Sequence, residues 1–182
     1  MNKLIDPTQV AFVPNRWITE NVILAQEVVH NFKTLKRKKG YIRVKLEFNK
    51  AYDRMEWSFL EAVLRAFGFN NKVVHLLMQC VCSVQFTLLP NGGIWFNFCP
   101  SRRLRQGDPL SPYLFILGSE ALFRLLNRKV QQGSLMGVKL GNSAPPISKL
   151  CYADDVILLC QARMDDVKSL MSCINTVTQI ST

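Results

Sequence analysis

Two adjacent aspartates, Asp154 and Asp155, stand between two short apolar runs within residues 147–160. Neighbouring carboxylates repel each other, and this repulsion raises one of their pKa values unless a cation lies between them. Mg²⁺ prefers carboxylate oxygens as ligands, so the pair is a candidate metal site. The alternative is a plain turn, because aspartate side chains commonly hydrogen-bond the backbone of tight turns.

Glu47 is a further candidate carboxylate. Residues 41–48 alternate between apolar and polar side chains, which predicts a strand with one apolar and one charged face. Glu47 lies on the charged face near the end of this strand, where it could join Asp154 in holding a divalent ion. The other interpretation is an ion pair with Arg43 or Lys45 on the same face.

A polar, glycine-containing loop precedes a predicted helix. Residues 104–112 are Leu-Arg-Gln-Gly-Asp-Pro-Leu-Ser-Pro, in which Ser111 suits a helix cap and Pro112 a first helical position. Free N–H groups at a helix start bind anions, and three arginines add charge: Arg102, Arg103 and Arg105. These features predict a contact with a nucleotide or nucleic acid. The alternative is a basic surface turn.

The overall charge favours a polyanionic partner. The 182 residues include 23 Lys and Arg against 13 Asp and Glu, a formal net charge of +10. Four of the cations lie together in a loop that either contacts phosphates or aids solubility: Lys36, Arg37, Lys38 and Lys39. No apolar run approaches the roughly 20 residues that span a bilayer, and no signal peptide follows Met1. We therefore expect an intracellular protein with no membrane contact.

Four segments together resemble the reverse transcriptase domain of LINE-type (non-LTR) retrotransposons, and the plant members most of all. Tyr-Ala-Asp-Asp at 152–155 is similar to the family's Y-x-D-D box, and residues 104–112 match its L-R-Q-G-D-P-L-S-P box. Residues 45–53 are similar to K-L-D-x-x-K-A-Y-D, and residues 12–16 to F-V-P-x-R. The segments follow the family's order and approximate spacing, and the resemblance covers about residues 10–178.

The resemblance implies RNA-directed DNA polymerase chemistry, with an RNA template, a DNA primer and deoxynucleoside triphosphates as partners. Two Mg²⁺ ions would assist attack of the primer 3′-hydroxyl on the α-phosphate. By position, Glu47, Asp154 and Asp155 would be the catalytic metal ligands. Residues matching the family's nucleotide-binding positions are Tyr52, Gln106, Gly107 and, with a weaker match, Arg16. No obligate protein partner follows from the resemblance.

Two positions differ from the family pattern. Glu47 replaces the first catalytic aspartate, and its extra methylene moves the carboxylate about 1.3 Å further from the strand. A misplacement of about 1 Å can lower a rate about 10²-fold. Arg103 replaces the usual glycine before Leu-Arg-Gln-Gly, where a positive φ would suit glycine and not arginine. We therefore expect weak or no polymerase activity.

The elements that must position these residues can be predicted from periodicity and turn signals. We expect strands at 41–48 and on both sides of Asp154-Asp155, and a hairpin of residues 84–88 and 94–98 around Pro90–Gly93. We expect helices at 19–33, 56–67, 71–81, 111–131 and from 165 onward, with Thr19 capping the first. Six cysteines without a C-x-x-C pair are typical of buried free thiols.

The predicted fold class is α+β: a polymerase palm-like antiparallel sheet covered on one face by helices, with partial fingers and no thumb. Residues 1–182 would form one partial reverse transcriptase domain, with a fingers remnant at about 1–40 and the palm at about 41–182. The apolar face of strand 41–48 should pack against the Trp57, Leu60, Leu64 and Phe67 stripe. Two other hypotheses are a non-enzymatic nucleic-acid-binding remnant and an unrelated α+β domain.

Overall fold

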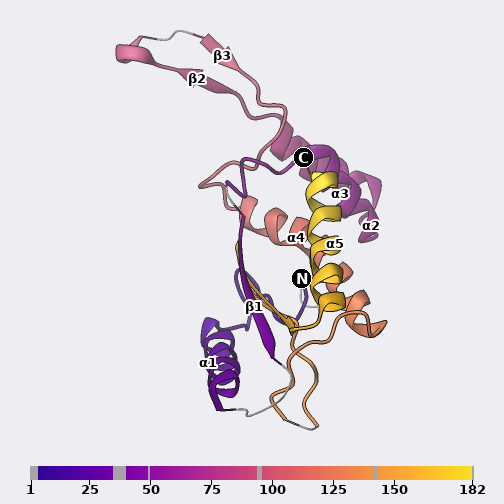
Figure 1. The fold of residues 1–182 in the computed structure, drawn as a ribbon. Helices are drawn as coiled ribbons and strands as arrows, with labels where there is room; N and C mark the ends of the chain where they lie inside the picture. The colour runs from indigo at the N-terminus through magenta and orange to yellow at the C-terminus, as the bar shows by residue number, and fades with distance from the viewer. Residues whose placement is uncertain (1–3, 35–39, 49, 94–95, 142, 182) are drawn as a thin grey trace. The chain divides into compact units, whose positions relative to one another are not determined.

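The structure is a computed structural model, and it describes residues 4–34, 40–48, 50–93, 96–141 and 143–181. Helices and antiparallel strands are mixed along the chain (Figure 1), so the predicted α+β class is confirmed. No helix among the described residues is long and apolar enough to cross a membrane.

The elements follow the predicted order closely. The helices are α1 (Ile18–Thr34), α2 (Trp57–Ala66), α3 (Asn71–Cys82), α4 (Ser111–Gln131) and α5 (Met164–Ser181). The strands are β1 (Tyr41–Glu47), β2 (Phe86–Leu88), β3 (Phe96–Phe98), β4 (Lys149–Tyr152) and β5 (Asp155–Gln161), with a short 3₁₀ turn η1 (Pro90–Gly92) between β2 and β3. Helix α1 begins at Ile18, so Thr19 is a helical residue and not the predicted cap.

The chain forms two compact units. One comprises Met1–Asn49 and Ser119–Gln179, and the other comprises Lys50–Gly118 and Ile180–Thr182. The chain passes between them near residue 50, again inside α4 after Gly118, and a third time near the end of α5. The predicted boundary between fingers and palm near residue 40 stays a prediction.

The first unit is built on a three-stranded antiparallel sheet with the strand order β1-β5-β4. Its register pairs Tyr41 with Gln161 and Glu47 with Asp155. The predicted strand and the predicted hairpin around Asp154 therefore lie in one sheet. Strand β1 joins β5 across more than a hundred residues of chain, which no local pattern specifies.

Helices cover both faces of this sheet, where one covered face was expected. On one face, Val44 and Leu46 of β1 pack in a cluster with Phe123 of α4 and Leu170 of α5. On the other face, Val28 of α1 packs with residues from β4, β5 and the loop before β4: Leu150, Leu159 and Val138. Figure 1 shows α1 on one side of β1 and α5 on the other.

Within its own unit, β1 packs against helices other than the expected α2 stripe. Helix α2 belongs to the second unit and buries Phe59, Leu60, Val63 and Leu64, a stripe shifted around the helix from the predicted one. The amphipathic pattern of α2 identified a buried face but not the surface that it covers. Helices α4 and α5 pack against β1 because the chain returns to this sheet after residue 118.

The second unit contains α2, α3 and the hairpin β2-β3, which is paired in the register Phe86 to Phe98 and Leu88 to Phe96. Asn70 caps α3 by accepting a hydrogen bond from the Val73 N–H at 2.9 Å. The six cysteines are free, but only Cys151, Cys160 and Cys173 are buried. The expectation of buried thiols was wrong for the exposed cysteines Cys80, Cys82 and Cys99.

Candidate active site

Two of the three candidate carboxylates meet at one end of the β1-β5-β4 sheet. Glu47 ends β1 and is paired with Asp155, which begins β5 and is paired in turn with Tyr152 at the end of β4. Opposed residues of antiparallel strands point to the same face. The side chains of Glu47 and Asp155 are 69% and 64% exposed. The structure brings Glu47 and Asp155 together, and their catalytic role stays a prediction.

Lys45 links these two carboxylates. Its Nζ lies 2.5 Å from Oε1 of Glu47 and 3.5 Å from Oδ1 of Asp155. The hydrogen bond from Lys45, together with its charge, lowers the pKa of the Glu47 carboxyl below its ordinary value. The ion pair that the charged face of the strand allowed is therefore present, and it includes Asp155 as well.

Asp154 lies in the tight connection between β4 and β5, which we call the acidic turn (Tyr152–Asp155). Ala153, the residue before it, has φ +52°, a backbone conformation that costs a non-glycine residue free energy. Gln9 contacts this residue twice: its Nε2 donates to the Ala153 carbonyl at 3.3 Å, and its Oε1 accepts from the Ala153 N–H at 3.0 Å.

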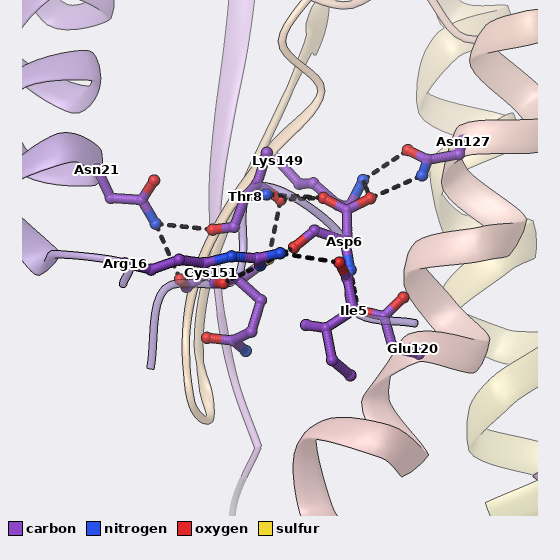
Figure 2. Close-up of polar contacts among 10 residues, drawn as sticks. Ile5, Asp6, Thr8, Arg16, Asn21, Glu120, Asn127, Lys149 and Cys151 are labelled. Carbon is purple, nitrogen blue, oxygen red and sulfur yellow. Dashed lines mark hydrogen bonds and ion pairs between the residues drawn. The ribbon is translucent and has the colours of Figure 1, made fainter. Parts of the chain in front are cut away.

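The segment that carries Gln9 is attached to β4 by backbone and side-chain hydrogen bonds. Cys151 N donates to the carbonyl of Thr8 at 3.1 Å, and Val10 N donates to the carbonyl of Cys151 at 3.3 Å. Asn21 of α1 adds bonds from its Nδ2 to the same two carbonyls, at 2.8 Å to Thr8 and 2.9 Å to Cys151 (Figure 2).

A buried ion pair lies beside this attachment. Lys149 Nζ is 2.8 Å from Oδ2 of Asp6, and the two side chains are only 3% and 4% exposed. Asn127 of α4 bonds both partners, accepting from Lys149 at 2.6 Å and donating to Asp6 at 2.7 Å (Figure 2). Burial acts to raise the pKa of Asp6, but the charge and hydrogen bond of Lys149, with those from Thr8, lower it below its ordinary value.

Glu120 of α4 is the third ionisable residue of this cluster. Its Oε1 accepts a hydrogen bond from the Asp6 N–H at 2.8 Å, and its side chain is buried. Burial raises the pKa of Glu120 to about 7. Glu120 therefore changes charge near neutral pH, unlike an exposed glutamate.

Arg16 lies in the same segment, and its contacts are structural. Its Nη1 donates to the carbonyls of Asp6 and Gln9, at 2.5 and 2.6 Å, and its Nη2 donates to the carbonyl of Ile5 at 3.2 Å (Figure 2). These bonds hold the turns of the segment together. The predicted nucleotide contact of Arg16 stays a prediction, and none of these three bonds supports it.

Sequence reasoning did not find this supporting cluster. One signal was available: Lys149 stands inside an apolar run, and a charged residue in a buried strand requires a partner. Asp6 was not among the predicted site residues. Gln9 and Asn21 carried no local signal, because a neutral amide side chain does not by itself indicate whether a residue is buried or exposed.

In the second unit, residues 101–108 form a loop that we call the basic loop. Gln106 and Gly107 are exposed, and Gly107 has φ +84°, which favours glycine. Asp108 Oδ1 accepts from the Leu110 N–H at 2.7 Å just before α4 begins at Ser111. Asp108, and not the predicted Ser111, therefore supplies a side-chain bond at this helix start.

The arginines of the basic loop are held to different extents. Arg102 pairs with Glu56 at 3.2 Å, and Arg105 is exposed. Arg103 has φ +98°, as expected of a position where the family carries glycine. Its guanidinium lies over the ring of Phe86, 4.7 Å from the centroid, and its Nε lies 3.8 Å from Oδ1 of Asp53.

Tyr52 belongs to the second unit and is partly buried. Its ring stacks on Phe115, with centroids 5.0 Å apart, and its carbonyl accepts from the Leu104 N–H at 2.8 Å. Tyr52 is thus connected to the basic loop through the backbone of Leu104. The predicted contacts of Lys36, Arg37, Lys38 and Lys39 lie outside the described residues.

The carboxylates suit a hard cation chemically, because Mg²⁺ takes oxygen ligands. Glu47 and Asp155 already share one positive charge, the ammonium group of Lys45. No cluster of three or more His, Cys, Asp or Glu side chains in the described ranges is arranged to hold a metal ion. The donor types fit Mg²⁺, and Lys45 would have to withdraw for a metal to take its place.

Sequence comparison identifies relatives of this chain. It matches the reverse transcriptase (RNA-dependent DNA polymerase) family over residues 1–181. An uncharacterized mitochondrial protein of Arabidopsis thaliana is 48% identical over 75 residues, which cover 41% of this chain and 62% of that protein. A retrovirus-related Pol polyprotein from a type-2 retrotransposable element of Drosophila melanogaster is 30% identical over 160 residues, 87% of this chain and 14% of the polyprotein.

A retrovirus-related Pol polyprotein from a type-1 retrotransposable element of Nasonia vitripennis is 32% identical over 164 residues, which cover 88% of this chain. These residues represent 15% of that polyprotein. The chain therefore spans less than a sixth of the length of either insect polyprotein and 62% of the Arabidopsis protein.

Solved structures share the fold. Apo telomerase from Candida tropicalis, truncated from its C-terminal domain, superposes with a TM-score of 0.64 at 15% identity, covering 96% of this chain and 34% of that one. Telomerase from Candida albicans, in complex with a fragment of telomeric RNA, also gives 0.64 at 10% identity, covering 94% and 29%. The antiparallel sheet with its helices is thus the palm-like fold that was predicted. The chain belongs to the reverse transcriptase family of RNA-dependent DNA polymerases.

Proposed function

We propose that this chain carries the nucleotidyl-transfer site of an RNA-directed DNA polymerase and that glutamate at position 47 makes the site weak. The observation that supports the proposal is the pairing of Glu47 with Asp155 on an exposed end of the sheet. A DNA primer paired with an RNA template, and a deoxynucleoside triphosphate, are the proposed substrates.

Glu47, Asp154 and Asp155 are the proposed ligands of Mg²⁺. When bound, the metal supplies activation of the primer 3′-hydroxyl and stabilisation of charge on the phosphates. The single positive charge of Lys45 offsets part of the negative charge of Glu47 and Asp155, which limits the repulsion between them. Tyr52, Gln106 and Gly107 are proposed to contact the nucleotide, and Arg102, Arg103 and Arg105 the nucleic acid backbone. Arg16 keeps its structural role.

Glu47 limits the rate in this proposal because of its length. Its carboxylate extends about 1.3 Å further from β1 than an aspartate would, and catalytic groups tolerate errors of about 0.5 Å. Glu47 also reaches back to Lys45, two residues earlier on the same face. Both effects draw the carboxylate away from the position that an aspartate would occupy.

Primer extension by the full chain tests the proposal. With an RNA template, a DNA primer and Mg²⁺ or Mn²⁺, the unsubstituted chain should extend weakly, and Glu47→Asp should raise the rate by at least about tenfold. Asp154→Asn in the Glu47→Asp background is the control and should abolish extension. Robust extension by the unsubstituted chain would contradict the role given to Glu47.

The alternative function is a non-enzymatic nucleic-acid-binding remnant. The ion pairs of Lys45 with both carboxylates favour it, since they occupy the oxygens that a metal requires. This alternative predicts that Glu47→Asp extends no primer while the chain still binds an RNA–DNA duplex. Duplex binding measured by fluorescence anisotropy beside the extension assay separates the two functions.

A further inference from the structure

The acidic turn has a backbone conformation that its own residues do not favour. Tyr152 pairs with Asp155, so Ala153 and Asp154 form a two-residue hairpin loop. The first position of such a loop has a positive φ in its preferred forms and commonly carries glycine or asparagine. Here it carries Ala153 with φ +52°. Something outside the turn must therefore hold it in this conformation.

The side chain of Gln9 meets this requirement. It is fully buried, and its amide bonds both polar backbone groups of Ala153 from a position 144 residues earlier in the chain. Oε1 also accepts from the Ala11 N–H at 3.0 Å, which fixes the orientation of the amide. A primary amide is suited to this contact because one group supplies a donor and an acceptor.

The backbone of Gln9 is itself held in place by neighbouring hydrogen bonds. Its backbone is flanked by the hydrogen bonds of Thr8 and Val10 to Cys151, and its carbonyl accepts from Arg16 at 2.6 Å. The amide therefore cannot follow a movement of the turn. The N–H and carbonyl of Ala153 therefore take the position that the Gln9 amide allows. This position determines where the backbone of Asp154 and Asp155 starts.

We propose that Gln9 is the positioning residue of the acidic turn: it holds Ala153 at positive φ, so that the turn keeps a single arrangement in which Asp155 lies beside Glu47. The turn conformation rests on the observed contacts alone. The consequence for metal binding rests on the proposed function.

The test compares Gln9→Met with Asn21→Leu in the full chain. Methionine keeps the size of Gln9 and removes both hydrogen-bonding groups. Asn21→Leu is the matched control, because Asn21 is also buried and bonds two backbone carbonyls but does not contact Ala153. The first readout is hydrogen exchange of the Ala153 amide relative to the Leu159 amide of β5, which donates to the carbonyl of Ser148 just before β4 at 2.8 Å. The second readout is Mn²⁺ affinity by electron paramagnetic resonance.

We expect Gln9→Met to lower the relative protection of Ala153 at least about tenfold and to weaken Mn²⁺ binding about tenfold, the usual effect of removing an outer support of metal ligands. Asn21→Leu should change both much less, because the backbone bonds of Thr8 and Val10 to Cys151 still hold the segment that carries Gln9. Equal Ala153 protection in both variants overturns the inference. If the unsubstituted chain binds no Mn²⁺, the proposed function loses its metal site, and the exchange of Ala153 still decides the role of Gln9.

A second substitution separates positioning from general destabilisation. Glycine adopts positive φ without strain, so Ala153→Gly should make the turn less dependent on Gln9. The loss of Mn²⁺ affinity caused by Gln9→Met should therefore shrink at least about threefold in the Ala153→Gly background. An undiminished loss in that background overturns the inference. If Gln9→Met does not fold, Gln9→Glu replaces it: when ionised, glutamate retains the acceptor, lacks the donor to Ala153 and adds a negative charge.

Discussion

The acidic turn and the basic loop support a strained residue in different ways. Ala153 in the acidic turn and Arg103 in the basic loop both have positive φ without being glycine. Both have their backbone N–H and carbonyl bonded. For Ala153 the partner is one buried side chain, that of Gln9, whereas Arg103 donates to the carbonyl of Met55 and accepts from the indole N–H of Trp57.

The surroundings of the two residues differ more than their backbones. Behind the acidic turn, Asp6 and Lys149 are buried, and they and the half-buried Asn127 satisfy one another. In the basic loop, Nε of Arg103 is buried without a hydrogen-bond partner among the described residues. The acidic turn thus depends on contacts that are costly to lose. The basic loop carries strain that a substitution can relieve.

The largest expected effect comes from breaking the support of the acidic turn. Lys149→Met leaves the carboxylate of Asp6 buried without its counter-ion, and removing one partner of a buried pair costs about 3 kcal/mol or more of unfolding free energy. Urea denaturation measures it. The exposed pair of Glu61 with Arg65 is the control, and Glu61→Gln should cost less than about 0.5 kcal/mol. Similar costs for the two would show that the buried cluster is not the stronger support.

A smaller effect should follow from the ionisation of Glu120. Because burial raises the pKa of Glu120 from 4.5 to about 7, the folded protein binds the proton more tightly than the unfolded chain does. The unsubstituted protein therefore loses stability as the pH rises through this window. Glu120→Gln cannot ionise and keeps an acceptor for the Asp6 N–H, so it should avoid that loss.

The unfolding free energy of Glu120→Gln relative to the unsubstituted protein should increase by about 2 kcal/mol between about pH 5 and pH 8. Most of this increase should occur below about pH 7. Thermal or urea unfolding across this range measures the difference. A difference independent of pH would mean that Glu120 ionises at its ordinary pKa and that the cluster behind the acidic turn is open to water.

The smallest effect belongs to the basic loop. Arg103→Gly and Arg103→Ala both lose the contacts with Phe86 and Asp53, but only glycine escapes the cost of φ +98°. Arg103→Gly should therefore be more stable than Arg103→Ala by about 1 kcal/mol. Unfolding free energies measure the pair. An alanine variant as stable as the glycine variant would show that the loop relaxes and stores no strain.

The pattern of the sequence picked out the candidate carboxylates, and the resemblance to the family predicted the conformation at position 103. Asp154, Asp155 and Glu47 stood out because charged residues interrupt or border apolar strands, a pattern that lies within a few residues of sequence. The packing of β1 was not predictable. The amphipathic pattern of α2 indicates that one face of this helix is buried, but it does not indicate which element covers that face. Gln9 and Arg16 were missed or given another role for a related reason, since their contacts join residues that no local pattern connects.

The sequence by itself determined where helices, strands and turns occur, which side chains of β1 face the core, and which residues carry charge. These properties follow from interactions between near neighbours along the chain. Only the tertiary structure decided that β1 lies beside β5, that Lys45 joins Glu47 to Asp155, and that Gln9 holds Ala153. Such contacts depend on how distant segments pack together, and packing is a property of the whole chain.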